Sequence, residues 1–318
     1  MNSNMIDELP KEIFLTISHN LDNIDLVIAA HVSKKWRLII TETFNLVSKN
    51  HFIDGVALKG YLLIIKWARS NGCRWGRSTC QHAASEGHLD VLKWLRKNNC
   101  PWNRWTCIRA GEQGHLNILK WAVKNNCPWD SEVCTKAAQN QHLNILIWAH
   151  KNNYEVDPIT CIISAVNDDL EMFEWARSHG CVPYEDVCWE AAYHGHLNFL
   201  IRAREVGCRW DKKTCSSAAM GGHLDILQWA RQNGCPWDKG VCLQAAARGH
   251  LDILQWARQN GCPWDNTVCR YAASHGYLDI LQWARQNGCP WDNYVCQLAA
   301  SHGHLDILDW ARLNGCPE

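Results

Sequence analysis

The chain has 318 residues with 32 basic and 32 acidic side chains, so its formal net charge is zero. This balance argues against nucleic acid or an anionic membrane surface as the main partner, and no apolar run is long enough to span a bilayer. The first ten residues, MNSNMIDELP, lack a basic segment and an apolar core, which predicts a cytoplasmic chain without a secretory signal.

Residues 5–43 form a first segment that is predicted to fold as three short helices. Pro10 suits the first turn of a helix, and apolar residues at every fourth position from Ile13 to Leu21 mark one helical face. Asp25 can cap a second helix, and Trp36 lies on the apolar face of a third.

The spacing of the apolar anchors in this segment resembles an F-box. The resemblance implies that the segment docks onto the Skp-family linker of a cullin–RING ubiquitin ligase. An alternative is a plain helical cap that covers the exposed end of the rest of the chain. The residues that the resemblance assigns to the contact or its supporting core are Leu9, Pro10, Ile13, Leu21, Leu26, Val32 and Trp36.

A 27-residue repeat dominates the rest of the chain. Each copy opens with Gly-His-Leu or a degenerate form of it, and positions are counted from 1 at that glycine. All 18 cysteines occupy positions 14 and 21, and all but three of the 19 tryptophans occupy positions 8 and 16. The unusually high numbers of cysteines and tryptophans therefore arise from the repeat. The ten repeats start at residues 60, 87, 114, 141, 168, 195, 222, 249, 276 and 303.

Each repeat is predicted to contain two short helices, A and B. Position 17 is usually aspartate, a good N-cap for helix A. Helix B follows the Gly-His pair and stops at a glycine with a proline just beyond, as at Gly234 and Pro236. One such pair cannot bury its apolar face, whereas a stack can. The predicted fold is thus all-α: an α-solenoid of about ten helical hairpins over residues 50–318, with its first helix beginning near Asn50.

The pattern Ala-Ala-x-x-Gly-His at a fixed period, as in residues 245–250, is similar to ankyrin repeats. The resemblance implies stacked helix pairs that bind other proteins. The ankyrin period is about 33 residues, so the β-hairpin finger of that family is expected to be trimmed here to Pro-Trp-Asp. Val-Cys replaces the Pro-Leu of the family. Arg231 replaces a core leucine of helix B, and the neighbouring Trp229 is expected to fill the lost volume.

The cysteines and histidines raise the alternative of a zinc-binding array. The two cysteines of a repeat, such as Cys235 and Cys242, have six residues between them, whereas structural zinc sites use closer pairs. Buried, apolar thiols are the simpler interpretation, and the row of histidines at position 2 is expected to satisfy backbone groups between repeats. No unique catalytic constellation or phosphate-binding loop is present. The sequence therefore predicts no enzyme, no metal and no cofactor.

Three nearly identical repeats, starting at 222, 249 and 276, differ mainly at positions 18, 19, 22, 23, 26 and 27. These positions fall on the predicted outward side of helix A and its approaches. Aromatic and arginine side chains there are typical of binding hot spots. We therefore expect this face to bind a target through Trp105, Arg109, Trp189, Tyr193, Arg248, Arg270, Tyr271 and Tyr294.

The function predicted from both segments is that of a substrate receptor in an SCF-type ubiquitin ligase. An interaction scaffold or decoy without a ubiquitin role is the alternative. The combination resembles proteins encoded by giant DNA viruses of amoebae, which implies host proteins as targets and the host cytoplasm as location. The degenerate repeats 141–167 and 168–194 are interpreted as ordinary decay that leaves a weaker joint, with a bend or a specific contact as the alternative.

Overall fold

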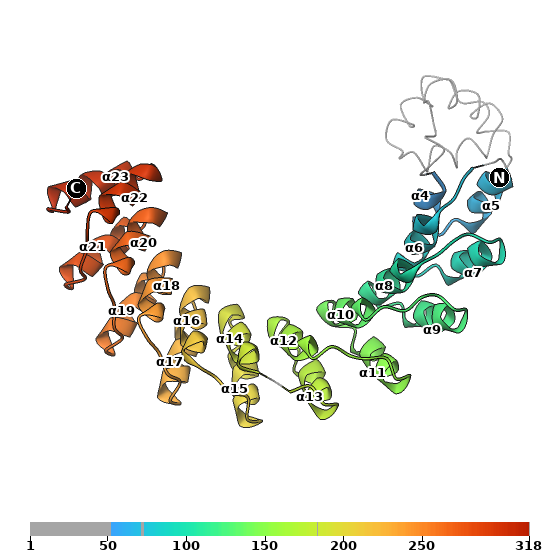
Figure 1. Ribbon diagram of the computed structural model, residues 1–318, viewed down its shortest axis with the longest axis horizontal. Coiled ribbons are helices and arrows are strands. Elements are labelled where there is room, and N and C mark those ends of the chain that lie inside the picture. Colours follow the sequence, from blue (N-terminus) through green and yellow to red (C-terminus); the bar gives the residue numbers. More distant parts are fainter. Residues whose placement is uncertain (1–51, 71–72, 183, 318) are drawn as a thin grey trace, which may run out of the picture. The chain divides into compact units, whose positions relative to one another are not determined.

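The computed structural model describes residues 52–70, 73–182 and 184–317. Within these ranges there are twenty α-helices and no β-strand (Figure 1), which confirms the predicted all-α solenoid. The chain divides into two compact halves, residues 1–156 and 157–318. The boundary falls inside the degenerate repeat 141–167. The predicted F-box-like segment, residues 5–43, lies outside the described residues.

Even-numbered helices are the A helices of the repeats, and odd-numbered helices are the B helices. In the N-terminal half they are α4 (Phe52–Leu58), α5 (Leu62–Ser70), α6 (Arg77–Ser85), α7 (Leu89–Lys97), α8 (Arg104–Glu112), α9 (Leu116–Lys124), α10 (Glu132–Gln139) and α11 (Leu143–Lys151). In the C-terminal half they are α12 (Ile159–Val166), α13 (Leu170–Ser178), α14 (Glu185–His194), α15 (Leu197–Glu205), α16 (Lys212–Gly221), α17 (Leu224–Gln232), α18 (Gly240–Arg248), α19 (Leu251–Gln259), α20 (Thr267–His275), α21 (Leu278–Gln286), α22 (Tyr294–Ser301) and α23 (Leu305–Leu313).

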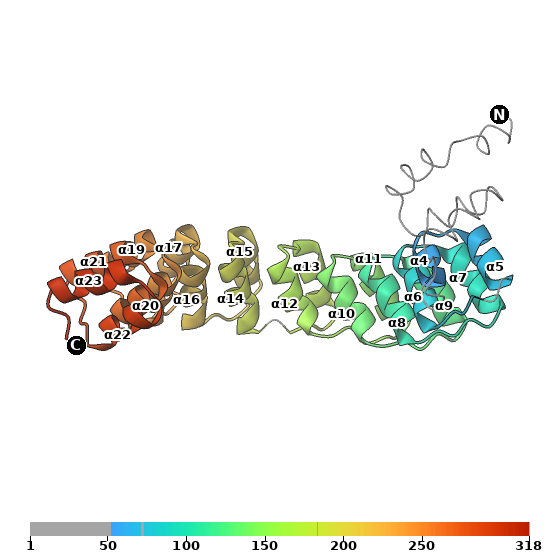
Figure 2. The same ribbon diagram turned by 90° about the horizontal axis from the view of Figure 1, so that it is seen from above.

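The A helices of successive repeats pack side by side within each half. In the C-terminal half, α14, α16, α18, α20 and α22 follow one another as one layer, and each rests on the B helix that comes directly after it in the chain, which opens the next repeat. Figures 1 and 2 show these two layers from perpendicular directions. This arrangement gives each half one face made of A helices and another made of B helices.

Residues at position 17 begin the A helices, as the sequence predicts. The Asp211 carboxylate accepts a hydrogen bond from the Lys213 backbone N–H at 2.9 Å, and Asp238 does the same for the N–H of Gly240. Asn103 replaces aspartate in an earlier repeat and accepts from Trp105 N–H at 3.1 Å. Each side chain satisfies one of the N–H groups that a helix start leaves without an internal partner.

The core lies between the two layers and consists of small and branched side chains. In the repeat that starts at 222, Ile226, Leu227, Ala230, Val241 and Cys242 are fully buried. The same positions are buried in the neighbouring repeats, so one continuous apolar cluster runs through the C-terminal half. Burial of one such branched side chain stabilises the fold by roughly 1.5–3 kcal/mol. The stack, and not the single hairpin, therefore makes the core.

The seam between repeats is built from the glycine at position 1 and the histidine of the next repeat. Gly195 has φ +86°, and a Cβ atom there would lie 2.6 Å from Cε1 of His223. The Nε2 atom of that imidazole is 3.1 Å from the Tyr193 carbonyl oxygen, which accepts its hydrogen bond. Asp168 is an exception at position 1, with φ 55° and a carboxylate 4.0 Å from His196.

The same bond recurs along both halves and confirms the role predicted for the histidine row. Each imidazole reaches a carbonyl oxygen thirty residues earlier, so it ties the end of helix A in one repeat to the start of helix B two repeats later. The pairs are His88 with Leu58, His115 with Ser85, His142 with Glu112, His196 with Val166, His223 with Tyr193, and His304 with Ser274.

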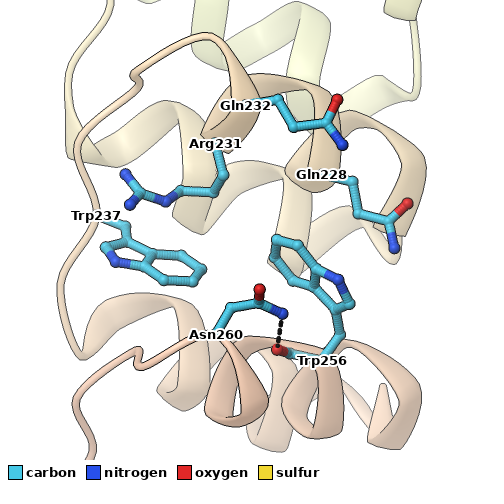
Figure 3. A pocket seen from close by; sticks show the side chains of 6 residues that line it. All are labelled: Gln228, Arg231, Gln232, Trp237, Trp256 and Asn260. Atoms are coloured by element: carbon cyan, nitrogen blue, oxygen red, sulfur yellow. Dashed lines mark hydrogen bonds between the residues drawn. The ribbon is translucent and has the colours of Figure 1, made fainter.

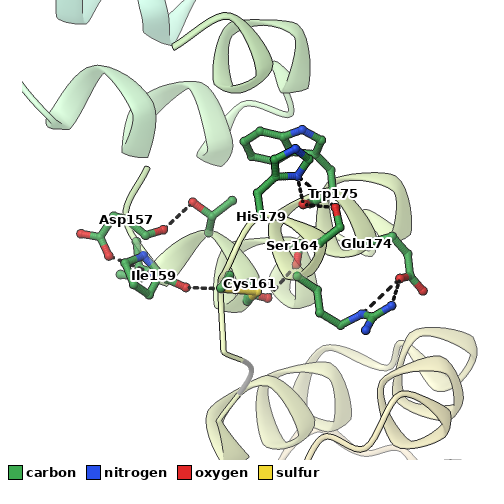
Figure 4. The surroundings of a disulfide bond; sticks show 12 residues. Asp157, Ile159, Cys161, Ser164, Glu174, Trp175 and His179 are labelled. Carbon is green, nitrogen blue, oxygen red and sulfur yellow. Dashed lines mark hydrogen bonds and ion pairs between the residues drawn. A yellow bond between two sulfur atoms is a disulfide. The ribbon is translucent and has the colours of Figure 1, made fainter. Parts of the chain in front are cut away.

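The cysteines are mostly buried thiols, as predicted. Burial raises the pKa of Cys134 to about 12, so that thiol is protonated at neutral pH and packs as a small apolar group. The prediction is wrong for one pair, because Cys161 and Cys181 are joined in a disulfide (Figure 4). Stacking brings position 21 of one repeat beside position 14 of the next, with a Cα–Cα distance of 6.6 Å in this pair.

Candidate target-binding face

The candidate site is the outward side of the A helices, which we call the A face and define as positions 18, 19, 22, 23, 26 and 27 of the repeats. The core-facing residues of helix A are at positions 20, 21, 24 and 25, as in Val241, Cys242, Ala245 and Ala246, all fully buried. Most residues at the remaining positions are half-buried or exposed, with Ile108, Ile163 and Ala247 as buried exceptions. In the C-terminal half they form a surface that continues from one A helix to the next.

In the N-terminal half, the A face carries Trp105 and Arg109 on α8. The Trp105 indole is half-buried and the Arg109 side chain is exposed. The guanidinium lies 5.9 Å from the ring centroid and forms an ion pair with Glu112 at 2.6 Å. The structure therefore brings these two predicted residues together. The Glu112 carboxylate partly neutralises the charge of Arg109, so the accessible part of the half-buried Trp105 indole is the main feature that a partner could contact.

In the C-terminal half, α14 presents Trp189 and Tyr193. The Trp189 Nε1–H group donates a hydrogen bond to Asp186 at 2.9 Å, and the Lys213 ammonium lies 5.8 Å from the indole centroid. Tyr193 is more open, with 36 % of its surface exposed. The ring of Tyr193 packs edge-on against His194 at 5.0 Å. These contacts fix the orientation of both aromatic rings before any partner binds.

The last predicted group spans α20 and α22. Two nitrogens of the Arg270 guanidinium bind the Asp292 carboxylate, with Nε 3.0 Å from each oxygen, and the same guanidinium stacks 4.4 Å above the Tyr294 ring. The Arg270 contact holds the pKa of Asp292 below its usual range. Tyr271 and Tyr294 remain 42 % and 51 % exposed. Two exposed tyrosines and an arginine held by Asp292 thus lie close together on this part of the A face.

The predicted residues do not form a single patch. Arg248 on α18 is exposed and makes no ion pair with the residues that the structure describes. The helix α16 lies between α18 and α14, so Arg248 is separated from Trp189 and Tyr193. Position 26 was predicted to lie on the outward side of helix A, but in one repeat it is buried, because Ala247 is only 8 % exposed. The A face therefore offers several local groups along a line.

Sequence reasoning missed an electrostatic ladder along this face. The cation at position 18 reaches the aspartate at position 17 of the next repeat: Lys212 to Asp238 at 2.8 Å and Lys239 to Asp265 at 2.7 Å. The Lys239 contact is the main cause that lowers the pKa of Asp265 to about 2. Each aspartate thus caps its own helix and pairs with the preceding repeat. The spacing of 26 residues between these opposite charges was the available signal.

Two further findings limit the chemistry of the described part of the chain. Among residues 52–70, 73–182 and 184–317, no group of three or more His, Cys, Asp or Glu side chains is placed to hold a metal ion. Within the same ranges, no helix combines the length and apolar character required to cross a membrane.

Comparison with known families supports both sequence resemblances. Residues 6–50 match the family model described as F-box-like. The family model for ankyrin repeats in many copies matches residues 242–285 and 269–312. No curated protein matches the chain significantly. Over these ranges the chain is similar to an F-box-like segment and to ankyrin repeats, and this similarity supports a protein-interaction module.

Proposed function

We propose that the protein is the substrate-receptor subunit of an SCF-type, cullin–RING ubiquitin ligase. The observation that carries the proposal is the presence of an F-box-like match at residues 6–50 and ankyrin repeats in one chain. The first module would connect to the ligase and the second would hold the target. A receptor of this kind needs no catalytic group of its own, because the ligase supplies the chemistry.

The N-terminal segment engages the Skp-family linker in this proposal. The residues assigned to that contact or its supporting core are Leu9, Pro10, Ile13, Leu21, Leu26, Val32 and Trp36. Apolar anchors inserted into a partner's groove dominate the binding free energy of such interfaces. The intact complex is expected to survive gentle washing. Replacement of one large apolar anchor residue is expected to abolish it.

Co-purification of the full-length chain with a Skp-family protein tests the ligase contact. The intact chain is expected to retain the partner, and Trp36→Ala or Leu9→Asp is expected to lose it. Tyr294→Ala is a matched control, because it removes an exposed aromatic ring from the A face and leaves the sequence of residues 6–50 unchanged. Failure of the intact chain to bind any Skp-family protein would refute the ligase role and favour a scaffold or decoy.

The A face is proposed to hold the target protein. The braced Arg270–Tyr294 stack and the exposed Tyr271 are ordered in advance, which lowers the entropic cost of binding. A pull-down with the full-length Trp36→Ala chain keeps targets attached without the ligase. Comparison with the same chain carrying Tyr271→Ala and Tyr294→Ala identifies proteins that depend on the A face. Identical sets of captured proteins would refute this assignment.

A further inference from the structure

The B-helix side of the C-terminal half carries a row of hollows that we call the Trp–Arg notches. Each lies between two successive B helices and is lined on one side by the tryptophan at position 16. The notch between α17 and α19 has a volume of about 440 Å³ and is lined by Gln228, Arg231, Gln232, Trp237, Trp256 and Asn260 (Figure 3). One repeat earlier, the equivalent notch has a volume of about 390 Å³ and is lined by Ile201, Arg204, Glu205, Trp210, Trp229 and Asn233.

The walls of each notch are fixed by the same contacts. The Arg231 guanidinium stacks on Trp237, 4.2 Å from the ring centroid, and donates to the Cys235 carbonyl oxygen. Trp237 and Trp256 meet edge-to-face with centroids 5.9 Å apart. Asn260 donates to the Trp256 carbonyl oxygen at 2.8 Å. Arg258 and Arg285 make the corresponding stacks in the next two repeats, also at 4.2 Å.

The row is positively charged. Arg204, Arg231, Arg258 and Arg285 form no ion pair with any residue that the structure describes. Other arginines of this half do find carboxylates, as Arg202 does with Glu174 and Glu205. The notch arginines are held instead by a neutral carbonyl group and an indole face. Glu205 lines the notch of Arg204. Arg231, Arg258 and Arg285 each present a guanidinium charge that no carboxylate pairs with, and an acidic side chain is their natural partner.

The rim of the notch can bind a polypeptide backbone. Gln228 is half-buried and Gln232 is exposed, and neither amide makes a hydrogen bond within the described residues. Side-chain amides donate readily to carbonyl groups. A ligand in polyproline II conformation has no internal hydrogen bonds and exposes its carbonyls to such donors. Aromatic grooves are also the usual docking surface for this conformation.

The spacing of the notches selects among extended ligands. Neighbouring packed helices lie roughly 8–10 Å apart, which sets the interval between successive notches. A polyproline II chain points a side chain in the same direction every three residues, or about every 9 Å. A β-strand does so about every 7 Å, and an α-helix of about 10–12 Å diameter is too wide to enter the gap between neighbouring helices. Polyproline II therefore matches the row.

We propose that the Trp–Arg notches of the C-terminal half bind an acidic, proline-rich polypeptide segment in polyproline II conformation. One carboxylate of every third residue meets one guanidinium, the prolines rest against the indoles, and the Gln amides bind the carbonyls. This surface is formed by the B helices and the loops that follow them, and so it differs from the A face. The proposal does not depend on the ligase role.

Fluorescence anisotropy with the full-length protein tests the proposal. The probe is a labelled peptide of Pro-Pro-Glu triplets, with Pro-Pro-Lys and Gly-Gly-Glu peptides of equal length as comparisons. The first peptide is expected to bind saturably and to weaken as salt is added. The lysine peptide is expected not to bind, and the flexible glycine peptide to bind at least about tenfold more weakly because it must be ordered.

Variants locate the binding site. Arg231→Met with Arg258→Met keeps the apolar stems and is expected to weaken binding about tenfold or more. Tyr271→Ala with Tyr294→Ala is the matched control on the A face and should leave the affinity unchanged. If the methionine variant loses helical structure, Gln232→Glu and Gln232→Lys replace it, since this side chain is exposed. The glutamate should weaken binding and the lysine strengthen it.

Five results would overturn the proposal, four of them from the peptides and the charge variants. These four are no saturable binding of the Pro-Pro-Glu peptide, equal binding of the lysine peptide, equal binding of the glycine peptide, and no difference between the two charge variants at position 232. Loss of binding in the A-face control would equally refute the assignment to the notches.

Discussion

Two glycine substitutions separate the cost of backbone conformation from the cost of packing at the seam between repeats. Gly195 and Gly234 have nearly the same left-handed backbone, with φ +86° and +83°. A Cβ atom at residue 195 would lie 2.6 Å from Cε1 of His223, whereas one at residue 234 would meet no heavy atom within 4 Å. Alanine at the two positions therefore differs mainly in what the new methyl group touches.

The structure gives the expected magnitudes. Alanine in the left-handed region costs about 1–2 kcal/mol at either site. At residue 195 the methyl group must also displace the imidazole of His223, and overpacking of this kind costs about 1–3 kcal/mol. If the ring turns away, it gives up its hydrogen bond to the Tyr193 carbonyl, worth about 0.5–1.5 kcal/mol. Gly195→Ala is therefore expected to destabilise the protein by about 1–3 kcal/mol more than Gly234→Ala.

Urea unfolding followed by far-UV circular dichroism measures the difference through the shift of the midpoint. Repeat arrays can unfold in steps, so hydrogen exchange of α15 and α17 provides the local measurement. Asparagine occupies the position equivalent to Gly234 in three repeats, with φ of 61–63°, and Gly234→Asn should be nearly neutral. Equal midpoints for the two alanine variants would refute the packing role assigned to His223.

Three further predictions concern charge, thiols and the notches. Ion pairing with Lys239 depresses the pKa of Asp265 to about 2. The stability from this pair is therefore complete above the ordinary pKa of about 3.9 and is lost as the pH falls toward about 2. Between these two pKa values, the thermal midpoint of the Asp265→Asn variant should fall less steeply with decreasing pH than that of the parent protein. An equal slope for the two proteins would contradict this prediction. Alkylation in denaturant before reduction should label sixteen cysteines and spare Cys161 and Cys181, whereas eighteen labels would exclude the disulfide. Trp256→Ala should lower the free energy of unfolding by about 3 kcal/mol in urea titrations, because it removes a packed indole; a change below about 1 kcal/mol would show that the edge-to-face pair contributes little.

The features predicted correctly from the sequence are those that depend on neighbours along the chain. An aspartate such as Asp211 caps a helix that begins at the next residue, and a glycine such as Gly234 ends a helix through its own φ angle. Both signals are complete within a few residues. The period of 27 then extends each local assignment to every copy, and the all-α solenoid follows from the need to bury the apolar faces.

The features that sequence reasoning missed depend on how one repeat is placed against the next. Cys161 and Cys181 are separated by 20 residues, and nothing in their local sequence indicates that stacking brings them together. Arg231 was interpreted as a substitution that costs core volume, yet it stacks on Trp237. Ala247 occupies a variable position and is nevertheless buried. Variation between copies marks the positions that tolerate substitution, but it does not show which of those positions are buried.

The two candidate surfaces differ in the kind of ligand that each can recognise. The A face changes from repeat to repeat, so a partner must be complementary to one particular set of side chains. The Trp–Arg notches are nearly identical in the repeats that start at 222, 249 and 276, so a partner that uses all of them must itself be periodic. One notch offers a ligand a single contact between carboxylate and guanidinium and one pair of indoles, so binding to one notch alone is weak. Several notches on one rigid stack raise the effective concentration for each successive contact. Affinity on that side should therefore depend on the number of ligand triplets, while affinity on the A face should depend on the identity of a few residues.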